Sequence, residues 1–456
     1  MGITKILSKI FDLNNIEYHY IENSVSGDTG TTWSANSATQ CNVANITLLK
    51  TSESIIFAIF PAKHHINLAQ LINILNKPVH YLNISEIHSF QEQCEEQDIS
   101  EIMVKHNIQV VIDLEVSDLS NVLFKNDSGK HYLSVFTENL EKLIIETPIG
   151  CLFSEAKPEF TYQPNLTQGV PRLDLANQIN NIKTLPILPE IAVQILQLQH
   201  NSDATVDSLA EIVSQDPALT SLILKYANSA LFGQRGKVDS VYDAILRVLG
   251  FDTVLYLAIG LAMGSSFELA KKGPLGSRNI WEHAVFSAAI CQKLSQKCPK
   301  EFRPSAGQAY LAGLLHDIGF LVLADSFKSE YFWLNKLIAS KPDVPITVIE
   351  QQLLGIHHTD LGKILLQSWN MPEFLTTVVA EHHNEDYLGN YCEISGLVLL
   401  VDRALKFHGR SDAFTDVLPE ELVSRLGLTN DKIFETVNEV LECSESLNIM
   451  VAAISA

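Results

Sequence analysis

The first 155 residues of this 456-residue chain contain no arginine. Arginine is the side chain best suited to bind phosphate through two parallel hydrogen bonds, so this part of the chain lacks the usual means of recognising phosphate. Positive charge is scarce throughout, since 32 Lys and Arg face 53 Asp and Glu, and the formal net charge is −21. Nonspecific binding of nucleic acid requires basic groups that neutralise phosphates, so nucleic acid is disfavoured as a partner.

Signals for membranes and secretion are also missing. No uninterrupted apolar run reaches membrane-spanning length, and MGITKILSKIFDLNNIEYHY lacks the basic flank, apolar core and cleavage site of a signal peptide. The 7 cysteines are irregularly spaced without a C-x-x-C pair, which favours reduced thiols over disulfides or a zinc cluster. We therefore expect a cytoplasmic protein that does not contact a membrane.

Length and composition predict a multidomain globular protein, because 456 residues with 46% hydrophobic content can form two or three cores. In residues 1–155, ESIIFAIFPA, EIMVKHNIQVVIDLEV and KHYLSVF predict strands, and HHINLAQLINILN predicts an amphipathic helix. We expect an α+β domain there. Residues 156–180 are rich in proline, glycine and polar residues, which is typical of an exposed linker.

Histidines and aspartates recur between residues 281 and 402, centred on His316-Asp317 in AYLAGLLHDIGFLVLAD. Adjacent residues on a helix point about 100° apart, so both side chains reach one metal only if it lies close against the helix. The other members lie in segments with helical spacing of apolar residues, so each could project from its own helix into a shared interior. The candidate ligands are His283, His316, Asp317, His357, His358, His382, His383 and Asp402.

Nitrogen and oxygen ligands without cysteine suit a divalent ion such as Mn, Fe, Mg, Ni or Zn. The pattern H…HD…H…HH…D resembles the HD superfamily of metal-dependent phosphohydrolases. The resemblance implies one or two ions that activate water against a phosphoester, with His316 and Asp317 at the catalytic centre. It favours His358 over His357, because the family histidine precedes a glycine by four residues, here Gly362.

The upstream motifs DPAL, ANSALFG and AILRVLG, together with ExxLLGIHHTDLGKILLQSWNMP from Glu350 to Pro372, resemble the HDOD domain, a signalling relative of the HD phosphohydrolases. This resemblance implies an all-α bundle at residues 181–410. Two helical patterns in VLPEELVSRLGLTNDKIFETVNEVLECSESLNIM predict a helical extension at 411–456 that covers the bundle or makes a dimer contact. Asp203 and Thr205 are expected to cap a helix at Val206–Val213, and Asp216-Pro217 to begin the next.

Two functions follow from this resemblance. HDOD proteins as a family are associated with bacterial signalling and regulation. The resemblance therefore implies that this chain is a regulatory protein that retains the metal site and acts on a protein partner. The alternative is an active phosphohydrolase acting on a phosphomonoester or phosphodiester, with a nucleotide or other phosphoester as ligand. Hydrolysis of cyclic dinucleotides is disfavoured, because Asn384 stands where the HD-GYP relatives have glutamate and no GYP sequence follows.

Residues 1–155 resemble the aminoacyl-tRNA deacylase (prolyl-tRNA editing, YbaK-like) domain in the order ANITLLKTSESIIFAIFPAKHHINLAQLINILNKPVHYLNISE. The family lysine ahead of its Thr-Leu pair is absent, because Ile46 precedes Thr47-Leu48 and Lys50 falls too late. The glycine- and proline-rich substrate loop is also missing. These departures imply that deacylase activity is lost and that the domain senses a ligand or binds a partner.

Several residues outside the candidate set are expected to be structural. His64 and His65 form a tempting pair, but no carboxylate at suitable spacing stands out in the sequence. Trp281 and Trp369 are expected to anchor the core, and Glu92, Glu95, Glu96 and Asp98 to face solvent. The remaining histidines away from the set are assigned to surfaces or satisfied interiors: His19, His80, His88, His106, His131, His200 and His408.

Overall fold

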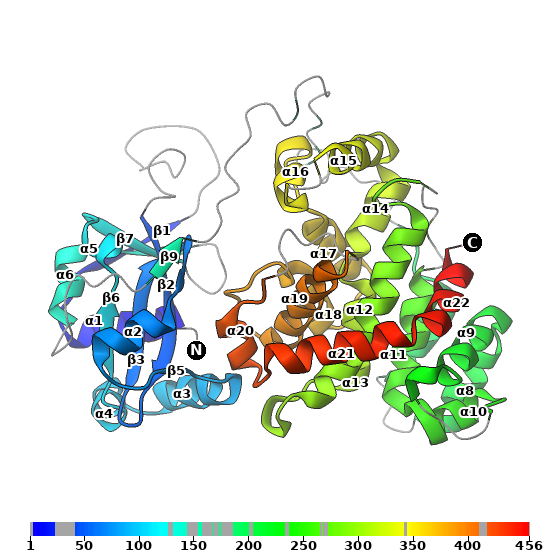
Figure 1. Ribbon diagram of the computed structural model, residues 1–456, viewed down its shortest axis with the longest axis horizontal. Helices are drawn as coiled ribbons and strands as arrows, with labels where there is room; N and C mark the ends of the chain where they lie inside the picture. Colours follow the sequence, from blue (N-terminus) through cyan, green and yellow to red (C-terminus); the bar gives the residue numbers. More distant parts are fainter. Residues whose placement is uncertain are drawn as a thin grey trace. The chain divides into compact units, whose positions relative to one another are not determined.

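The computed structural model describes residues 3–22, 42–125, 131–143, 154–156, 186–199, 204–232, 237–264, 272–341, 344–409 and 417–455, with 167, 173, 175 and 267 as single residues. The chain divides into two compact units, Met1–Glu159 and Phe160–Ala456, shown in Figure 1. The first unit is built on a β-sheet and the described residues of the second unit form helices without strands, so the predicted multidomain organisation is confirmed.

In the described residues of the first unit, a seven-stranded mixed sheet has the strand order β1-β8-β7-β2-β3-β6, with β5 paired to β2. A separate two-stranded sheet pairs β4 with β9. The strands are β1 Tyr18–Glu22, β2 Val43–Lys50, β3 Ile55–Pro61, β4 His64–Ile66, β5 His80–Tyr81, β6 Gln109–Ile112, β7 Asn121–Lys125, β8 His131–Phe136 and β9 Ser154–Ala156. The helices are α1 Ile3–Leu13, α2 Leu68–Leu75, α3 Ile84–Glu96, α4 Ile99–Lys105, α5 Leu114–Ser117 and α6 Thr137–Leu140.

Two predicted strands and one helix of this unit are confirmed. ESIIFAIFPA contains β3 and KHYLSVF contains β8, and Asn67 caps α2 by accepting a hydrogen bond from Gln70 N at 3.0 Å. The prediction of strands throughout residues 101–116 is wrong, because only β6 is extended. Asp98 caps α4 and Asp113 caps α5, so side-chain capping turns the flanking apolar residues into short helices.

His64 lies in strand β4 and is buried, with 3% of its surface exposed. Its Nδ1 is 2.9 Å from Ser154 Oγ on β9, and its Nε2 is 3.4 Å from a carboxylate oxygen of Glu115. The backbone N–H of Ser154 donates to Asp113 Oδ2 at 2.9 Å. His64 therefore ties β4, β9 and α5 together, and the partner carboxylate that the sequence did not reveal is Glu115.

The second unit is a helical bundle. Its helices are α7 Glu190–Gln199, α8 Val206–Ser214, α9 Pro217–Ala227, α10 Val241–Ala244, α11 Phe251–Gly264, α12 Ser277–Lys297, α13 Ala306–Leu315, α14 Ile318–Ser326, α15 Lys328–Ser340, α16 Ile346–Leu353, α17 His358–Ser368, α18 Glu373–Glu381, α19 Cys392–Phe407, α20 Glu420–Arg425, α21 Asn430–Glu442 and α22 Ser444–Ile454. A π-helical turn at Ile245–Leu249 links α10 to α11. Helix α12 packs against α13, α19 and α21, and both Trp281 and Trp369 are buried as predicted.

The capping predictions for Thr205 and Asp216 are confirmed, and Asp203 lies outside the described residues. Thr205 accepts a hydrogen bond from Ser208 N, and Asp216 accepts from Ala218 N, with Pro217 as the first residue of α9. A buried polar chain joins these helices to α12, because Tyr226 Oη donates to Gln292 Oε1 at 2.7 Å and Gln292 Nε2 donates to Thr253 Oγ1 at 3.3 Å. The upstream segment and the helix that carries His283 thus share one core.

The segment after residue 410 contributes α20, α21 and α22. Helix α21 packs against α12 and α19, and Figure 1 shows it crossing the bundle. The prediction that this segment covers the bundle is confirmed, and a dimer contact stays a prediction. The linker expected at 156–180 lies almost entirely outside the described residues. Leu175 within it is fully buried and its N–H donates to Leu354 O at 2.9 Å, so at this residue an exposed linker is wrong.

One stretch of the described residues, Ala306–Ser326, is long and apolar enough to cross a membrane by length and composition. It comprises α13 and α14, and 89% of its most apolar window is buried inside the protein. Such burial is equally typical of the central helix of a bundle, which must be apolar on all sides. This stretch carries His316 and Asp317 at the junction of the two helices.

Candidate metal centre

The structure brings all seven predicted ligand side chains into one cluster inside the bundle. Each comes from a helix or a helix end, so the site is a product of helix packing rather than of a single loop. Their positions are His283 on α12, His316 and Asp317 between α13 and α14, His358 at the start of α17, His382 and His383 after α18, and Asp402 on α19.

The first half of the cluster consists of His283, His316 and Asp402, with ligand atoms that all lie within 4.8 Å of one another. His283 Nε2 is 3.0 Å from His316 Nε2 and 3.5 Å from Asp402 Oδ1. His316 and Asp402 are buried, and His283 is partly exposed on the side of the site that faces a pocket. These atoms form a set of two nitrogens and one oxygen.

The second half consists of His358, His382 and His383, whose ligand atoms likewise lie within 4.8 Å. His358 Nε2 is 3.4 Å from His382 Nε2 and 3.3 Å from His383 Nε2. His357 lies outside the cluster, where its Nδ1 is 3.8 Å from Asp360 Oδ2 at the start of α17. The structure thus places His358 rather than His357 in the site.

Asp317 lies between the two halves. Its Oδ2 is 3.4 Å from His316 Nε2 and 3.6 Å from His283 Nε2. Its Oδ1 is 3.3 Å from His358 Nε2 and 3.6 Å from His382 Nε2. One carboxylate therefore presents one oxygen to each half, which is the arrangement of a ligand that could be shared by two ions.

Backbone carbonyls orient two of the imidazoles. His316 Nδ1 is 2.9 Å from Gly313 O and His382 Nδ1 is 3.0 Å from Val379 O. A carbonyl can only accept, so Nδ1 must carry the proton in each ring, and in the neutral rings each Nε2 presents a lone pair to the cluster.

Glu350 on α16 is a functional residue that sequence reasoning missed. It is fully buried, and both of its carboxylate oxygens lie 3.0 Å from His358 Nδ1. One of them also accepts the backbone N–H of His358 at 3.1 Å. A carboxylate behind a ligating histidine orients the ring and increases its basicity. The sequence feature that points to Glu350 is its position as the first residue of the motif ExxLLGIHH, which also contains His358.

Burial and charge shift the pKa values in this cluster in different directions. Burial lowers the pKa of His316 to about 3, which keeps the ring neutral. Burial opposes the charge on His358, but the carboxylates of Glu350 and Asp317 outweigh it and raise the pKa of that ring well above 6.5. Burial would raise the pKa of Asp317, but the surrounding imidazoles hold it well below its ordinary value. Asp317 is therefore ionised.

These residues fit a divalent metal ion. The Nε2 lone pairs of His316 and His382 lie 3.0 Å from His283 Nε2 and 3.4 Å from His358 Nε2, and such spacings require a cation or a proton between the two nitrogens. Asp317 Oδ1 is buried and has no hydrogen-bond partner among the described residues. The donor set of imidazole nitrogens and carboxylate oxygens suits Mn, Fe, Ni or Zn, with Mg less well matched to so many nitrogens.

A pocket of about 500 Å³ opens onto this centre. His283 and Asp317 line its inner end, and Phe320, Ile280 and Ile338 contribute apolar walls. Lys341 and Lys406 also line it. The centre is therefore reachable by a small ligand, and apolar side chains, two lysines and Glu282 line the approach.

Comparison with known proteins identifies the fold. Residues 185–385 match the family model of the HDOD domain, and this range includes every cluster residue except Asp402. A curated protein of Treponema pallidum (strain Nichols), described as uncharacterized, is 23% identical over 273 residues, which cover 59% of this chain and 51% of that protein. The match thus spans about half the length of that relative.

A solved structure with a TM-score above 0.5 has a similar fold. A candidate signal transduction protein from Marinobacter aquaeolei VT8 is 23% identical, with a TM-score of 0.54 over 100% of both chains. A candidate metal-dependent phosphohydrolase from Shewanella amazonensis SB2B is 20% identical, with a TM-score of 0.46 over 63% of this chain and 100% of that chain. The match of residues 185–385 to the HDOD family model confirms the predicted HDOD resemblance for that part of the chain.

Proposed function

We propose that this chain is a bacterial cytoplasmic regulatory protein whose HDOD domain holds one or two divalent metal ions. The observation that carries the proposal is Asp317, whose two oxygens each face a separate set of histidines within 3.3 to 3.6 Å. Few structural demands require an ionised carboxylate and five imidazoles in one buried cluster, because burying charge is costly unless the charge is compensated.

His283, His316, Asp402 and Asp317 Oδ2 would hold one ion. His358, His382, His383 and Asp317 Oδ1 would hold the other, with Glu350 fixing the orientation of His358. Bound divalent ions lower the pKa of coordinated water and neutralise charge on phosphoryl oxygens. The chain's own residues orient the imidazoles and exclude bulk water from all but the side of the centre that opens to the pocket.

Several observations favour regulation as the biological role. An HDOD domain is joined here to a second, independently packed unit, and a full-length structural neighbour is named as a candidate signal transduction protein. We assign the first unit, with its deacylase-like sequence order, to sensing a ligand or binding a protein partner. Loss of editing chemistry is supported by Lys50, which forms an ion pair with Glu86.

A second candidate function is that of a working phosphohydrolase. The pocket of about 500 Å³ that reaches His283 and Asp317 favours it, because Lys341 and Lys406 could attract the anionic part of a phosphoester. In this case a phosphomonoester or phosphodiester would react at the metal centre, and the first unit would be regulatory.

Metal content measured by inductively coupled plasma mass spectrometry tests the proposal. We expect about one or two ions per chain in gently purified protein. His316→Ala/Asp317→Ala should lose the metal, while His357→Ala, which alters the adjacent histidine outside the cluster, should keep it. Circular dichroism separates metal loss from unfolding, and His383→Ala provides a milder variant.

A folded wild-type protein without metal after loading with Mn, Fe, Ni or Zn would overturn the proposal. Release of phosphate from phosphoesters by the loaded protein would favour the second candidate.

A further inference from the structure

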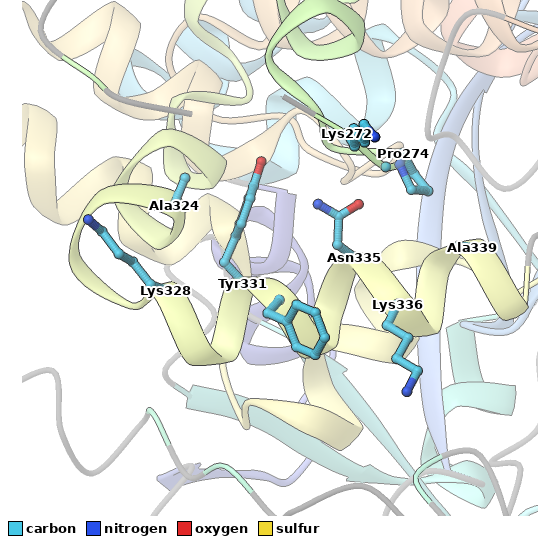
Figure 2. Close-up of a pocket in the computed structure, with 10 residues that line it drawn as sticks. Lys272, Pro274, Ala324, Lys328, Tyr331, Asn335, Lys336 and Ala339 are labelled. Carbon is cyan, nitrogen blue, oxygen red and sulfur yellow. The ribbon is translucent and has the colours of Figure 1, made fainter. Parts of the chain in front are cut away.

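A second pocket, of about 590 Å³, lies beside helix α15 and away from the metal ligands. Figure 2 shows Tyr331 and Asn335 projecting from α15 toward the segment that carries Lys272 and Pro274. Pro274 and Ala339 line both this pocket and the one that opens onto the metal centre, so the two are neighbours that share a wall. The volume falls within the range of roughly 300–1,000 Å³ that is common for small-molecule sites.

Specific bonds hold this pocket open. Tyr331 Oη donates to Leu275 O, and Leu275 N–H donates to Asn335 Oδ1 at 3.1 Å. Gly273 has a φ of +102°, and a Cβ there would lie 2.4 Å from Asn335 Oδ1, so the loop needs a glycine at this point. Because two buried side chains fix the loop, the pocket is formed before any ligand arrives.

Asn335 also offers a hydrogen-bond donor to this pocket. Its side chain is 9% exposed and its Oδ1 is occupied by Leu275. Among the described residues, none accepts a hydrogen bond from its Nδ2. A ligand with a carbonyl or ring-nitrogen acceptor could therefore satisfy this amide.

Lys272, Lys328 and Lys336 line the pocket, and no carboxylate among the described residues forms an ion pair with any of them. This cluster is unusual in a chain with a formal net charge of −21. Lys328 and Lys336 are eight residues apart on α15, which corresponds to about 12 Å along a helix. Lysine side chains are long and flexible, so both ammonium groups could reach a multiply charged anion that lies between them.

The middle of the pocket is apolar. Phe332 lies between the lysines in sequence and is 59% exposed, a large fraction for a phenyl ring. The methyl groups of Ala324 and Ala339 and the ring of Pro274 add further apolar surface. A flat, apolar body could pack on the Phe332 ring while the charged part of the same molecule reaches the lysines.

We propose that this pocket, formed by α15, the end of α14 and the segment from Lys272 to Pro274, binds a nucleoside diphosphate. The base would pack against Phe332 and accept a hydrogen bond from Asn335, and the two phosphates would interact with the lysines. Binding requires none of the metal ligands, so the site functions whether or not the centre is loaded. A ligand here would contact the wall that separates it from the pocket at the metal centre.

Isothermal titration calorimetry of the full-length protein, treated with EDTA, tests this site with adenosine diphosphate, adenosine and pyrophosphate as probes. We expect adenosine diphosphate to bind more tightly than either fragment. Lys328→Gln/Lys336→Gln should lower the affinity for adenosine diphosphate roughly tenfold, since two exposed charge contacts are lost. Phe332→Ala should lower the affinity for adenosine diphosphate but leave the affinity for pyrophosphate unchanged.

The matched control is Lys225→Gln/Lys237→Gln, which removes the same charge from exposed positions outside the pocket and should leave the affinity unchanged. The proposal is overturned if wild type does not bind adenosine diphosphate, if both double variants lose affinity equally, or if pyrophosphate binds as tightly as the nucleotide. Binding of a glutamate-rich peptide through the same lysines, without nucleotide binding, would instead identify a docking site for an acidic protein. Absence of metal would leave the expected results intact.

Discussion

The backbone of Gly319 lies directly against the carbonyl of His358. A Cβ built at Gly319 would be 1.9 Å from His358 O and 2.6 Å from its carbonyl carbon, far inside van der Waals contact. Both atoms belong to backbone, so neither can rotate away. Gly319 therefore permits α14 and α17 to approach closely enough for Asp317 Oδ1 to lie 3.3 Å from His358 Nε2.

We predict that Gly319→Ala separates α14 from α17 and weakens metal binding. Overpacking of this kind destabilises a core by roughly 1–3 kcal/mol. Gly396→Ala on α19 is the matched control, because the atoms nearest to a Cβ there belong to the side chain of Leu422, which can move. Denaturant unfolding and metal content measure both effects. Equal metal content in the two variants would contradict the role assigned to Gly319.

Glu350→Gln should lower metal affinity by about 10- to 100-fold, a range typical for removing a carboxylate behind a ligating histidine. The substitution keeps the size of the side chain and removes the charge that faces His358 Nδ1 at 3.0 Å. Competition with a chelator measures the affinity. Glu381→Gln, which changes a carboxylate that accepts from exposed Asn384, should have little effect. The assignment of Glu350 fails if the two variants retain equal affinity.

Metal affinity should fall as the pH is lowered through the raised pKa of His358. That pKa lies above 6.5 because Glu350 and Asp317 stabilise the charged ring, and a protonated ring has no lone pair for an ion. The fall should therefore begin above pH 6.5, whereas Glu350→Gln should shift it to lower pH. Chelator competition at a series of pH values provides the measurement, and a flat profile between pH 6 and 8 would count against this account.

In the metal-free protein, the raised pKa of His358 has the opposite effect: it makes stability decrease, not increase, as the pH rises. A histidine with a raised pKa contributes stability that is fully present below its unfolded pKa of about 6.5 and is lost as the pH rises through the folded pKa. The EDTA-treated helical unit should thus lose this contribution on going to alkaline pH, and loading with metal should restore stability there.

His64→Ala should destabilise the first unit without changing metal content. The substitution leaves Ser154 Oγ without its imidazole partner in a buried site, at a cost of about 1–3 kcal/mol. His19→Ala on the exposed part of β1 is the control and should cost little. Differential scanning calorimetry resolves the two units if they unfold separately. Loss of metal in His64→Ala would show that the units are energetically coupled.

Much of the candidate centre could be predicted from sequence because its members keep a characteristic order and lie on helices with clear apolar spacing. The role of Glu350 could not, since it depends on how α16 turns back onto α17. The strand prediction for residues 101–116 is wrong because short apolar runs fit a strand or a helix equally well, and the caps Asp98 and Asp113 favour the helices. The pocket beside α15 could not be predicted from the sequence either, because Lys272 and α15 come together only in the folded chain.

The most direct test of the metal centre is anomalous diffraction from crystals of the protein soaked in manganese. We predict anomalous density on either side of Asp317, one peak among His283, His316 and Asp402 and the other among His358, His382 and His383. A single peak on one side of Asp317 would establish a one-ion centre within the same ligand set. Density elsewhere in the protein, or none in the bundle, would contradict the central claim.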